Sequence, residues 1–119
     1  ALEDPDPVVI MEHATLYNEE GDVPASGEMA VDIDRAAIRR AGEHATIVTY
    51  SANVAKALAA AETPAAEGTE CEVIDLRTLR PRDDATLTPS IRKTTRAARA
   101  HQSCRPGSRA STRSPRPPG

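Results

Sequence analysis

The three histidines are the natural starting point for chemistry, because an imidazole can bind a metal ion or move a proton near neutral pH. His13, His44 and His101 are scattered along the chain, and none belongs to a spacing typical of metal ligands. Glu12 precedes His13 but lacks the second histidine of an HExxH motif. A lone histidine at a strand end is more often a surface or capping residue than a catalyst. We therefore assign no chemistry to any of the three.

The carboxylates and cysteines form no catalytic pattern either. The acidic clusters at residues 19–22 and 83–84 are typical of solvated turns and helix caps rather than of paired acids. Cys71 lies in an apolar strand pattern and is expected to be a buried thiol, while Cys104 lies in the basic C-terminal segment. Lys56 falls on the polar face of a predicted helix. With no GxGxxG, GxxxxGK(S/T) or CxxC motif, the sequence predicts no catalytic, cofactor-binding or metal-binding residue.

Several segments have the composition of strands that could position such a site. Val8–Met11 is a continuous apolar run bounded by proline and charge, which suits a strand buried on both faces. Thr46–Tyr50 and Cys71–Leu76 are apolar and contain β-branched residues. Residues 36–40 can form a short strand or a turn.

A helix over residues 54–62 is predicted between the last two strands, which makes a βαβ unit with a right-handed crossover. Its apolar face would consist of Val54, Leu58 and Ala61. Ser51 or Asn53 would cap its start, and Gly68 is placed to end it.

Beyond residue 62, proline and a loss of apolar residues interrupt this pattern. Pro64 would sit inside a longer helix, so we expect a break at Glu62, with Thr63 capping a new turn. Asp83 starts a second helix that runs to about Thr95. Residues 97–102 are neither apolar nor β-branched, so the sequence predicts no third parallel strand and an incomplete sheet.

Charge divides the chain in two. All 18 Asp and Glu lie in residues 1–84, whereas residues 92–119 carry eight Lys or Arg. The net charge of −3 is therefore the sum of −11 before residue 91 and +8 after it. Residues 97–119 lack the apolar content that would offset the entropy of ordering, and we expect a disordered basic tail that binds polyanions weakly. This composition is also typical of GC-rich codons read out of phase, which favours a frameshift between about codons 92 and 100.

Four stretches carry a family resemblance: VVIMEH, LYNEEGDVP, AAIRRAGEHATIVTYSANVAKALAAAE and AAEGTECEVIDLRTLRP. Together they resemble the beta subunit of the decarboxylating component of 2-oxoacid dehydrogenase complexes, of the pyruvate, acetoin or branched-chain type. The resemblance implies an α/β fold. Residues 1–13 would end a pyrimidine-binding domain with its last strand, and residues 14–35 would form an interdomain linker. Residues 36–96 would form part of a transketolase-type C-terminal domain with a parallel sheet and a crossover helix.

The resemblance also implies thiamine diphosphate between the alpha and beta subunits of a heterotetramer, with Mg²⁺ held by the alpha chain. In the family, the cofactor's ylid attacks a 2-oxo acid, and the acyl group passes to a lipoyl arm on an acyltransferase core. No residue here matches the family's activating glutamate or its active-site histidine. The chain alone is therefore expected to bind no cofactor and to be inactive. The sequence departs from the family pattern at Pro64, at Arg82 and after Arg96.

Two other hypotheses stay open. Another transketolase-like enzyme, such as a deoxyxylulose phosphate synthase, shares the domain architecture, although LYNEEGDVP followed by AAIRRAG favours the beta subunit. A non-enzymatic module could use the basic tail to bind phosphates. The tail has no aromatic residue to stack bases, so nucleic-acid binding is not expected. No apolar run could span a membrane and the N-terminus lacks a basic n-region, which favours a cytoplasmic protein.

Overall fold

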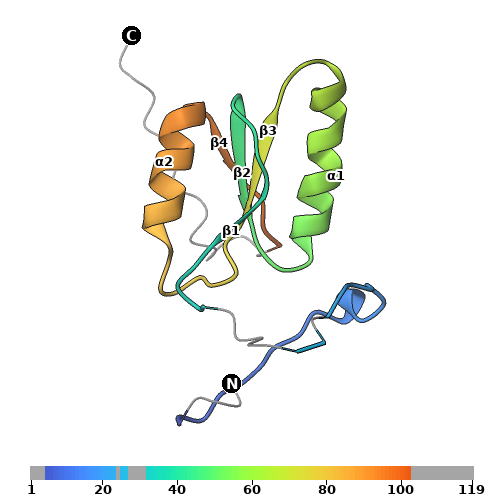
Figure 1. The fold of residues 1–119 in the computed structure, drawn as a ribbon, viewed down its shortest axis with the longest axis vertical. Coiled ribbons are helices and arrows are strands. Elements are labelled where there is room, and N and C mark those ends of the chain that lie inside the picture. Colours follow the sequence, from blue (N-terminus) through green and yellow to red (C-terminus); the bar gives the residue numbers. More distant parts are fainter. Residues whose placement is uncertain (1–4, 24, 27–31, 103–119) are drawn as a thin grey trace. The chain divides into compact units, whose positions relative to one another are not determined.

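The computed structural model describes residues 5–23, 25–26 and 32–102. The chain divides into two compact units at residues 30 and 31, and each is described by itself. In the second unit, a four-stranded sheet lies between two helices (Figure 1). In the part of the chain that is described, no helix has both the length and the apolar content to cross a membrane.

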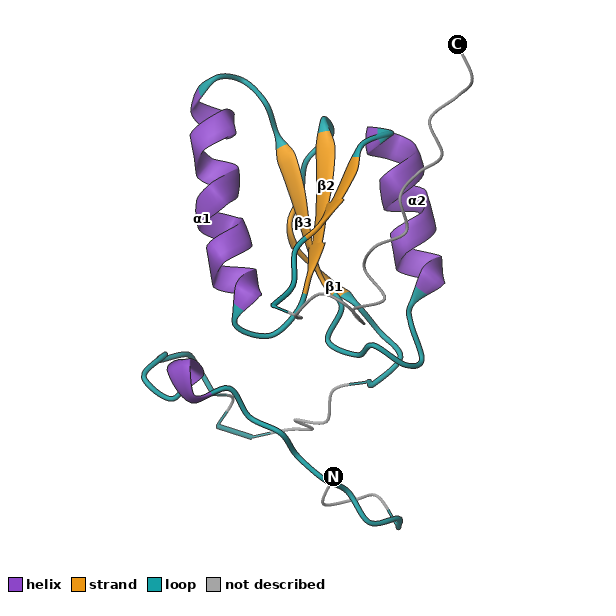
Figure 2. Cartoon of the chain, turned by 180° about the vertical axis from the view of Figure 1, so that it is seen from behind, coloured by secondary structure: helices purple, strands orange, loops and turns teal. Residues whose placement is uncertain are grey.

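The centre of the sheet is the parallel pair β2 (Ala45–Thr49) and β3 (Cys71–Asp75). Helix α1 (Asn53–Ala66) connects them and packs on one face of the sheet (Figure 2). Helix α2 (Asp84–Thr94) follows β3 and covers the opposite face. The predicted parallel pairing with a crossover helix is confirmed.

Two edge strands complete the sheet, in the order β1-β3-β2-β4. β1 (Ala37–Arg40) runs antiparallel to β3, so the predicted short strand forms here rather than a turn. β4 (Ala97–Arg99) pairs parallel with β2, so the expectation that the sheet stops before residue 97 is wrong. β4 forms because its backbone groups bond to those of β2, even though its side chains are neither large and apolar nor β-branched. The Thr46 amide donates to the Arg96 carbonyl at 2.8 Å, and the Ala100 amide donates to the Val48 carbonyl at 3.0 Å.

The alternation of side chains along the central strands creates a separate apolar core on each face. On the α1 face, the buried residues are Ala57, Ala61, Cys71 and Val73. On the α2 face, they are Val48, Ile74, Leu76 and Leu87. Val73 and Ile74 are adjacent in β3 and both fully buried, so this strand buries side chains on both faces of the sheet.

The predicted break of α1 at Glu62 is wrong, because the helix continues through Pro64 to Ala66. The proline costs the helix one hydrogen bond, which an amide at this position would donate to the Ala60 carbonyl, and the helix ends two residues later. Its carbonyl accepts from the Thr69 amide at 2.8 Å and so helps to close the end of the helix. Gly68 follows with φ +82°, as predicted for a residue that ends a helix.

The start of α1 also differs from the prediction. The N-cap is Ala52, whose side chain makes no capping hydrogen bond, instead of Ser51 or Asn53. Ser51 comes one position too early and has a left-handed φ of 55°, while Asn53 is already helical. The helix therefore depends on its packing against the sheet rather than on a polar cap.

In the first unit, Val8–Met11 is not a strand, although its composition predicts one. None of the described strands pairs with it, and a strand without a partner has no hydrogen bonds to hold it. These four apolar side chains are exposed, with Met11 at 92%. The described regular structure of this unit is the short 3-10 helix η1 (Ala14–Leu16).

A close approach at Gly42 holds the entry to β2 against the entry to β3. The amides of Glu43 and His44 both donate to the Glu70 carbonyl, at 3.1 and 2.9 Å. A Cβ atom on Gly42 would lie 2.4 Å from the backbone atoms of both Cys71 and Glu72. The absence of a side chain at residue 42 is therefore a condition of this contact.

We expect Gly42→Ala to lower the free energy of unfolding of this unit by about 3 kcal/mol, because its methyl group would meet backbone that cannot rotate away. Denaturant unfolding followed by circular dichroism measures the loss. Gly21→Ala is the matched control, since nothing lies within 4 Å of a Cβ at that position. Equal stability of the two variants would contradict the role given to Gly42.

Candidate functional site

The carboxyl ends of β2, β3 and β4 meet at one edge of the sheet, which is where open α/β sheets bind ligands. Ser51 follows β2 and Arg77 follows β3, and both have φ near the left-handed region, at 55° and 56°. The Arg77 amide donates to Oδ1 of Asp75 at 3.0 Å, which fixes the second of these turns. A ligand site of the kind usual in α/β sheets would lie at this edge.

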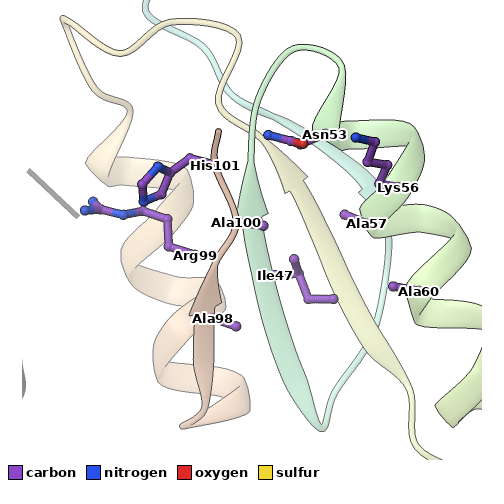
Figure 3. Close-up of a pocket in the computed structure, with 9 residues that line it drawn as sticks. All are labelled: Ile47, Asn53, Lys56, Ala57, Ala60, Ala98, Arg99, Ala100 and His101. Carbon is purple, nitrogen blue, oxygen red and sulfur yellow. The ribbon is translucent and has the colours of Figure 1, made fainter. Parts of the chain in front are cut away.

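A pocket of about 490 Å³ lies beside this edge, between α1 and β4 (Figure 3). Its walls are mainly apolar and come from β2, α1 and the β4 segment: Ile47, Ala57, Ala60, Ala98 and Ala100. Lys56 and Asn53 lie together at one end, whereas Arg99 and His101 point away from α1. The pocket is therefore a mainly apolar hollow whose three basic lining residues do not converge on one point.

A second hollow, of about 320 Å³, lies beside α2 and β4. Its apolar wall contains Val48, Leu76, Leu87 and Ile91, and Arg82, Asp84 and Arg99 also line it. Alanines occupy two of the three positions in β4, and their small side chains leave space next to each helix. The edge of the sheet at β4 is thus hollowed in two places. The ionisable residues that line the second hollow are Arg82, Asp84 and Arg99, and two of them, Arg82 and Asp84, are paired with each other.

The most buried charge is Glu72 of β3, whose side chain is 1% exposed. Nζ of Lys93 on α2 lies 2.7 Å from its Oε2, and the Thr46 hydroxyl lies 3.3 Å from its Oε1. The Thr46 and Thr94 hydroxyls are 2.7 Å apart, and Thr94 also donates to the Ser90 carbonyl at 3.2 Å. These contacts join β2, β3 and α2. They satisfy a buried carboxylate rather than present it to a substrate.

Sequence reasoning missed this pair, although a signal for it exists. An acidic residue stands inside the apolar strand Cys71–Asp75, and a carboxylate in such a place needs a cation. Lys93 is on the last turn of the helix that comes after this strand. The pairing becomes visible only when α2 is known to cover that face of the sheet.

Asp83 is the N-cap of α2, as predicted. Its carboxylate accepts from the Thr86 hydroxyl at 2.6 Å, from the Thr86 amide at 3.0 Å and from the Ala36 amide at 3.0 Å. These hydrogen bonds, that of the Thr86 hydroxyl above all, lower the pKa of Asp83 to about 2. Asp84 pairs with Arg82 at 2.6 Å. The 83–84 cluster thus caps a helix, and it also anchors the segment that enters β1.

His13 and His44 each make a local hydrogen bond. Nδ1 of His13 lies 2.8 Å from the Thr15 hydroxyl and caps η1. Nδ1 of His44 accepts from the Glu70 amide at 2.9 Å. Among residues 5–23, 25–26 and 32–102, no three His, Cys, Asp or Glu side chains are grouped so that they could hold a metal ion.

The remaining candidates are Cys71, the acidic cluster at residues 19–22, Lys56 and Cys104. Cys71 is a buried free thiol. The acidic residues at positions 19–22 are exposed. Lys56 is exposed on α1. Cys104, like most of the predicted tail at residues 97–119, lies outside the described residues.

Similarity to known proteins identifies the family to which this sheet belongs. Residues 34–112, which include all four strands, match the family described as transketolase, C-terminal domain. The chain belongs to this family. Its sheet resembles part of a solved split-gene transketolase described as an inactive beta4 tetramer, with a TM-score of 0.58 and 33% identity over 63% of this chain and 25% of that one.

Curated relatives place this family member more narrowly. It is 48% identical to the mitochondrial pyruvate dehydrogenase E1 component subunit beta-1 of Arabidopsis thaliana, over 81% of this chain and 27% of that protein. It is 47% identical to the beta subunit of the acetoin:2,6-dichlorophenolindophenol oxidoreductase of Cupriavidus necator, over 81% of this chain and 28% of that protein. The resemblance to beta subunits is confirmed, and the chain spans about a quarter of the length of these relatives.

We expect Lys93→Met to destabilise the unit by about 2 kcal/mol, because it leaves the Glu72 carboxylate buried without its cation. Thermal or denaturant unfolding measures the effect. Lys56→Met, which removes an exposed lysine from α1, should change stability by less than about 0.5 kcal/mol. Adding Glu72→Leu to Lys93→Met should recover most of the loss. Equal effects of the two lysine variants would show that the buried pair does not contribute.

The low pKa of Asp83 predicts a specific dependence of stability on pH. Its folded pKa of about 2 lies below the ordinary 3.8, so the unfolded chain takes up the proton first as the pH falls. The stabilisation is complete above about pH 4 and is lost as the pH falls towards 2. Asp83→Asn should flatten this part of the stability curve in unfolding experiments at successive pH values. Thr86→Val should flatten it in part, and curves parallel to that of the wild type would contradict the assignment.

Proposed function

We propose that this chain forms part of the beta subunit of a thiamine diphosphate-dependent 2-oxoacid dehydrogenase, and that it contributes a structural domain rather than catalytic groups. The observation that carries the proposal is the 38–48% identity to beta subunits of pyruvate and acetoin enzymes over 81% of the chain. The same relatives support this assignment over a deoxyxylulose phosphate synthase. Pyruvate or a related 2-oxo acid would be the substrate of the complete enzyme.

The described residues do not fit thiamine diphosphate and Mg²⁺. The larger hollow has mainly apolar walls, and its basic lining residues do not converge, since Lys56 lies at one end while Arg99 and His101 point away from α1. This arrangement is a poor match for a diphosphate. Metal binding would need a group of oxygen ligands, and the acidic residues nearest the smaller hollow are already engaged, Asp84 with Arg82 and Asp83 with Thr86. We therefore derive no catalytic step from this chain, and the cofactor would be held elsewhere in a complete enzyme.

Assembly with other subunits is part of the same proposal. The relatives are named as beta subunits, and the solved neighbour is described as a tetramer. The partners would be an alpha subunit, in a heterotetramer, and the acyltransferase core implied by the family resemblance. The role of this domain would be to hold its part of that assembly in shape.

A chimaera tests the proposal. Residues 34–102 would replace the matching segment of the Cupriavidus necator beta subunit, and the product would be expressed with its own alpha subunit. We expect the chimaera to keep at least about a tenth of the parent's oxidative activity, because under this proposal the replaced segment supplies no reacting group. A chimaera that assembles normally but shows no activity would overturn the proposed role.

The isolated chain provides the second arm of the test. Titration calorimetry with thiamine diphosphate and Mg²⁺ should detect no binding at micromolar concentrations, since a diphosphate needs several cationic or backbone donors. The parent heterotetramer is the positive control. Tight binding by the isolated chain would show that the catalytic assignment, and not the family assignment, is wrong.

A further inference from the structure

Strand β4 contributes little buried apolar surface of its own. Its three residues, Ala97–Arg99, are all exposed, and two of them are alanines. Burial of apolar side chains, the main stabilising contribution in a core, is therefore small here. β4 nevertheless pairs in register with β2. Contacts on either side of the strand help to hold it there, and those on its N-terminal side belong to a buried polar network.

The N-terminal end of β4 follows closely on helix α2. Thr94 is the last residue of α2, Thr95 turns the chain with a left-handed φ of 57°, and Arg96 comes next. The Arg96 carbonyl accepts from the Thr46 amide at 2.8 Å and lies 3.2 Å from the Thr94 hydroxyl. Because only Thr95 separates Thr94 from Arg96, the position of Thr94 constrains where the Arg96 carbonyl lies relative to β2.

The Thr94 side chain is connected in turn to the carboxylate of Glu72, and we call Thr46, Glu72, Lys93 and Thr94 the Glu72 network. A carboxylate paired with a lysine accepts hydrogen bonds and donates none, so the Thr46 hydroxyl, 3.3 Å from Oε1 of Glu72, donates to it. The Thr46 oxygen is then left to accept from the Thr94 hydroxyl. These two hydroxyls are 2.7 Å apart, closer than the 3.2 Å between the Thr94 hydroxyl and each of two backbone carbonyls.

The Glu72 network lies where polar groups are costly. Thr46 is fully buried, Glu72 is 1% exposed and Thr94 is 4% exposed. Apolar residues could fill the same space without needing partners. Buried hydrogen bonds can instead restrict a chain to one arrangement, because each of them requires its partner at one position and in one orientation. The arrangement restricted here is that of α2 and β4 against β2.

We propose that the Glu72 network determines whether β4 is part of the sheet. With the network intact, Thr94 holds Arg96 at the Thr46 amide, and β4 pairs with β2. When the carboxylate is lost, the turn at Thr95 is no longer fixed, and β4 leaves the sheet while β1, β2 and β3 stay paired. Glu72 and Thr94 are thus positioning residues that act on one edge strand, a role that goes beyond the function proposed above.

Amide hydrogen exchange of the full chain, followed residue by residue by NMR, tests the proposal. The Thr46 amide donates to the segment that enters β4, and the Ala100 amide donates from the end of that strand to β2. The Leu76 amide donates to the end of β2 at 2.9 Å and so reports on the central pair of strands. The Ala100 carbonyl is also held by the Thr49 hydroxyl, at 3.0 Å, so Ala100 should respond less than Thr46.

Thr94→Val keeps the branched shape of the side chain and removes its hydroxyl. We expect exchange at Thr46 to become at least about tenfold faster, while exchange at Leu76 stays within about twofold of the wild type. Thr88→Val is the matched control on the same helix, because Thr88 is exposed, and it should change none of the three amides. Equal acceleration at all three amides in Thr94→Val, or no acceleration at Thr46, would overturn the proposal.

The double variant Glu72→Leu/Lys93→Met separates this role from a contribution to overall stability. Its apolar side chains can fill the buried space, so its unfolding midpoint should lie close to that of the wild type. The Thr46 hydroxyl would nevertheless lack the carboxylate that orients it, and exchange at Thr46 should stay at least about tenfold faster than in the wild type. A double variant that protects the Thr46 amide as well as the wild type does would refute the proposal.

Discussion

The parallel register of β2 and β3 is the constraint on which the rest of this structure depends. Ile47 lies opposite Val73 and Val48 lies opposite Ile74, so each face of the sheet receives one pair of large apolar residues. Each pair packs under one of the two helices. The same register places Thr46 opposite Glu72, so the buried carboxylate meets a hydroxyl as well as a lysine. A shift by one residue would exchange the two faces and bury the carboxylate under α1, away from Lys93.

The sequence predicted the elements whose own side chains decide their structure. The central strands are recognisable because apolar and β-branched residues fill both faces, and Asp83 is recognisable because a capping carboxylate acts on its own helix. The errors concern segments whose structure depends on a neighbour. β4 forms because β2 offers backbone partners, despite its alanines, and Val8–Met11 stays irregular because no described strand pairs with it. Sequence patterns describe single segments, and they record pairing only indirectly.

The same distinction, between what one segment decides and what depends on its neighbours, applies to the candidate site. Sequence reasoning recognised Asp83 as the start of a helix and Cys71 as a buried thiol, which are properties of single segments. What it could not supply was the shape of the β4 edge, because the hollows arise between elements rather than within one. Their apolar walls suit packing against another surface more than they suit chemistry, which agrees with a structural role for this domain.

The strand order has a consequence for how the chain folds as it is synthesised. β1 precedes β2 in the sequence but pairs only with β3, so its edge has no partner until residue 75 has left the ribosome. The anchor at Asp83, which accepts from the Ala36 amide, becomes available later still. The β2-α1-β3 unit is therefore the earliest part of the sheet that can form, and β1 stays unpaired until β3 has been synthesised. During this interval the backbone groups of β1 have no partner strand.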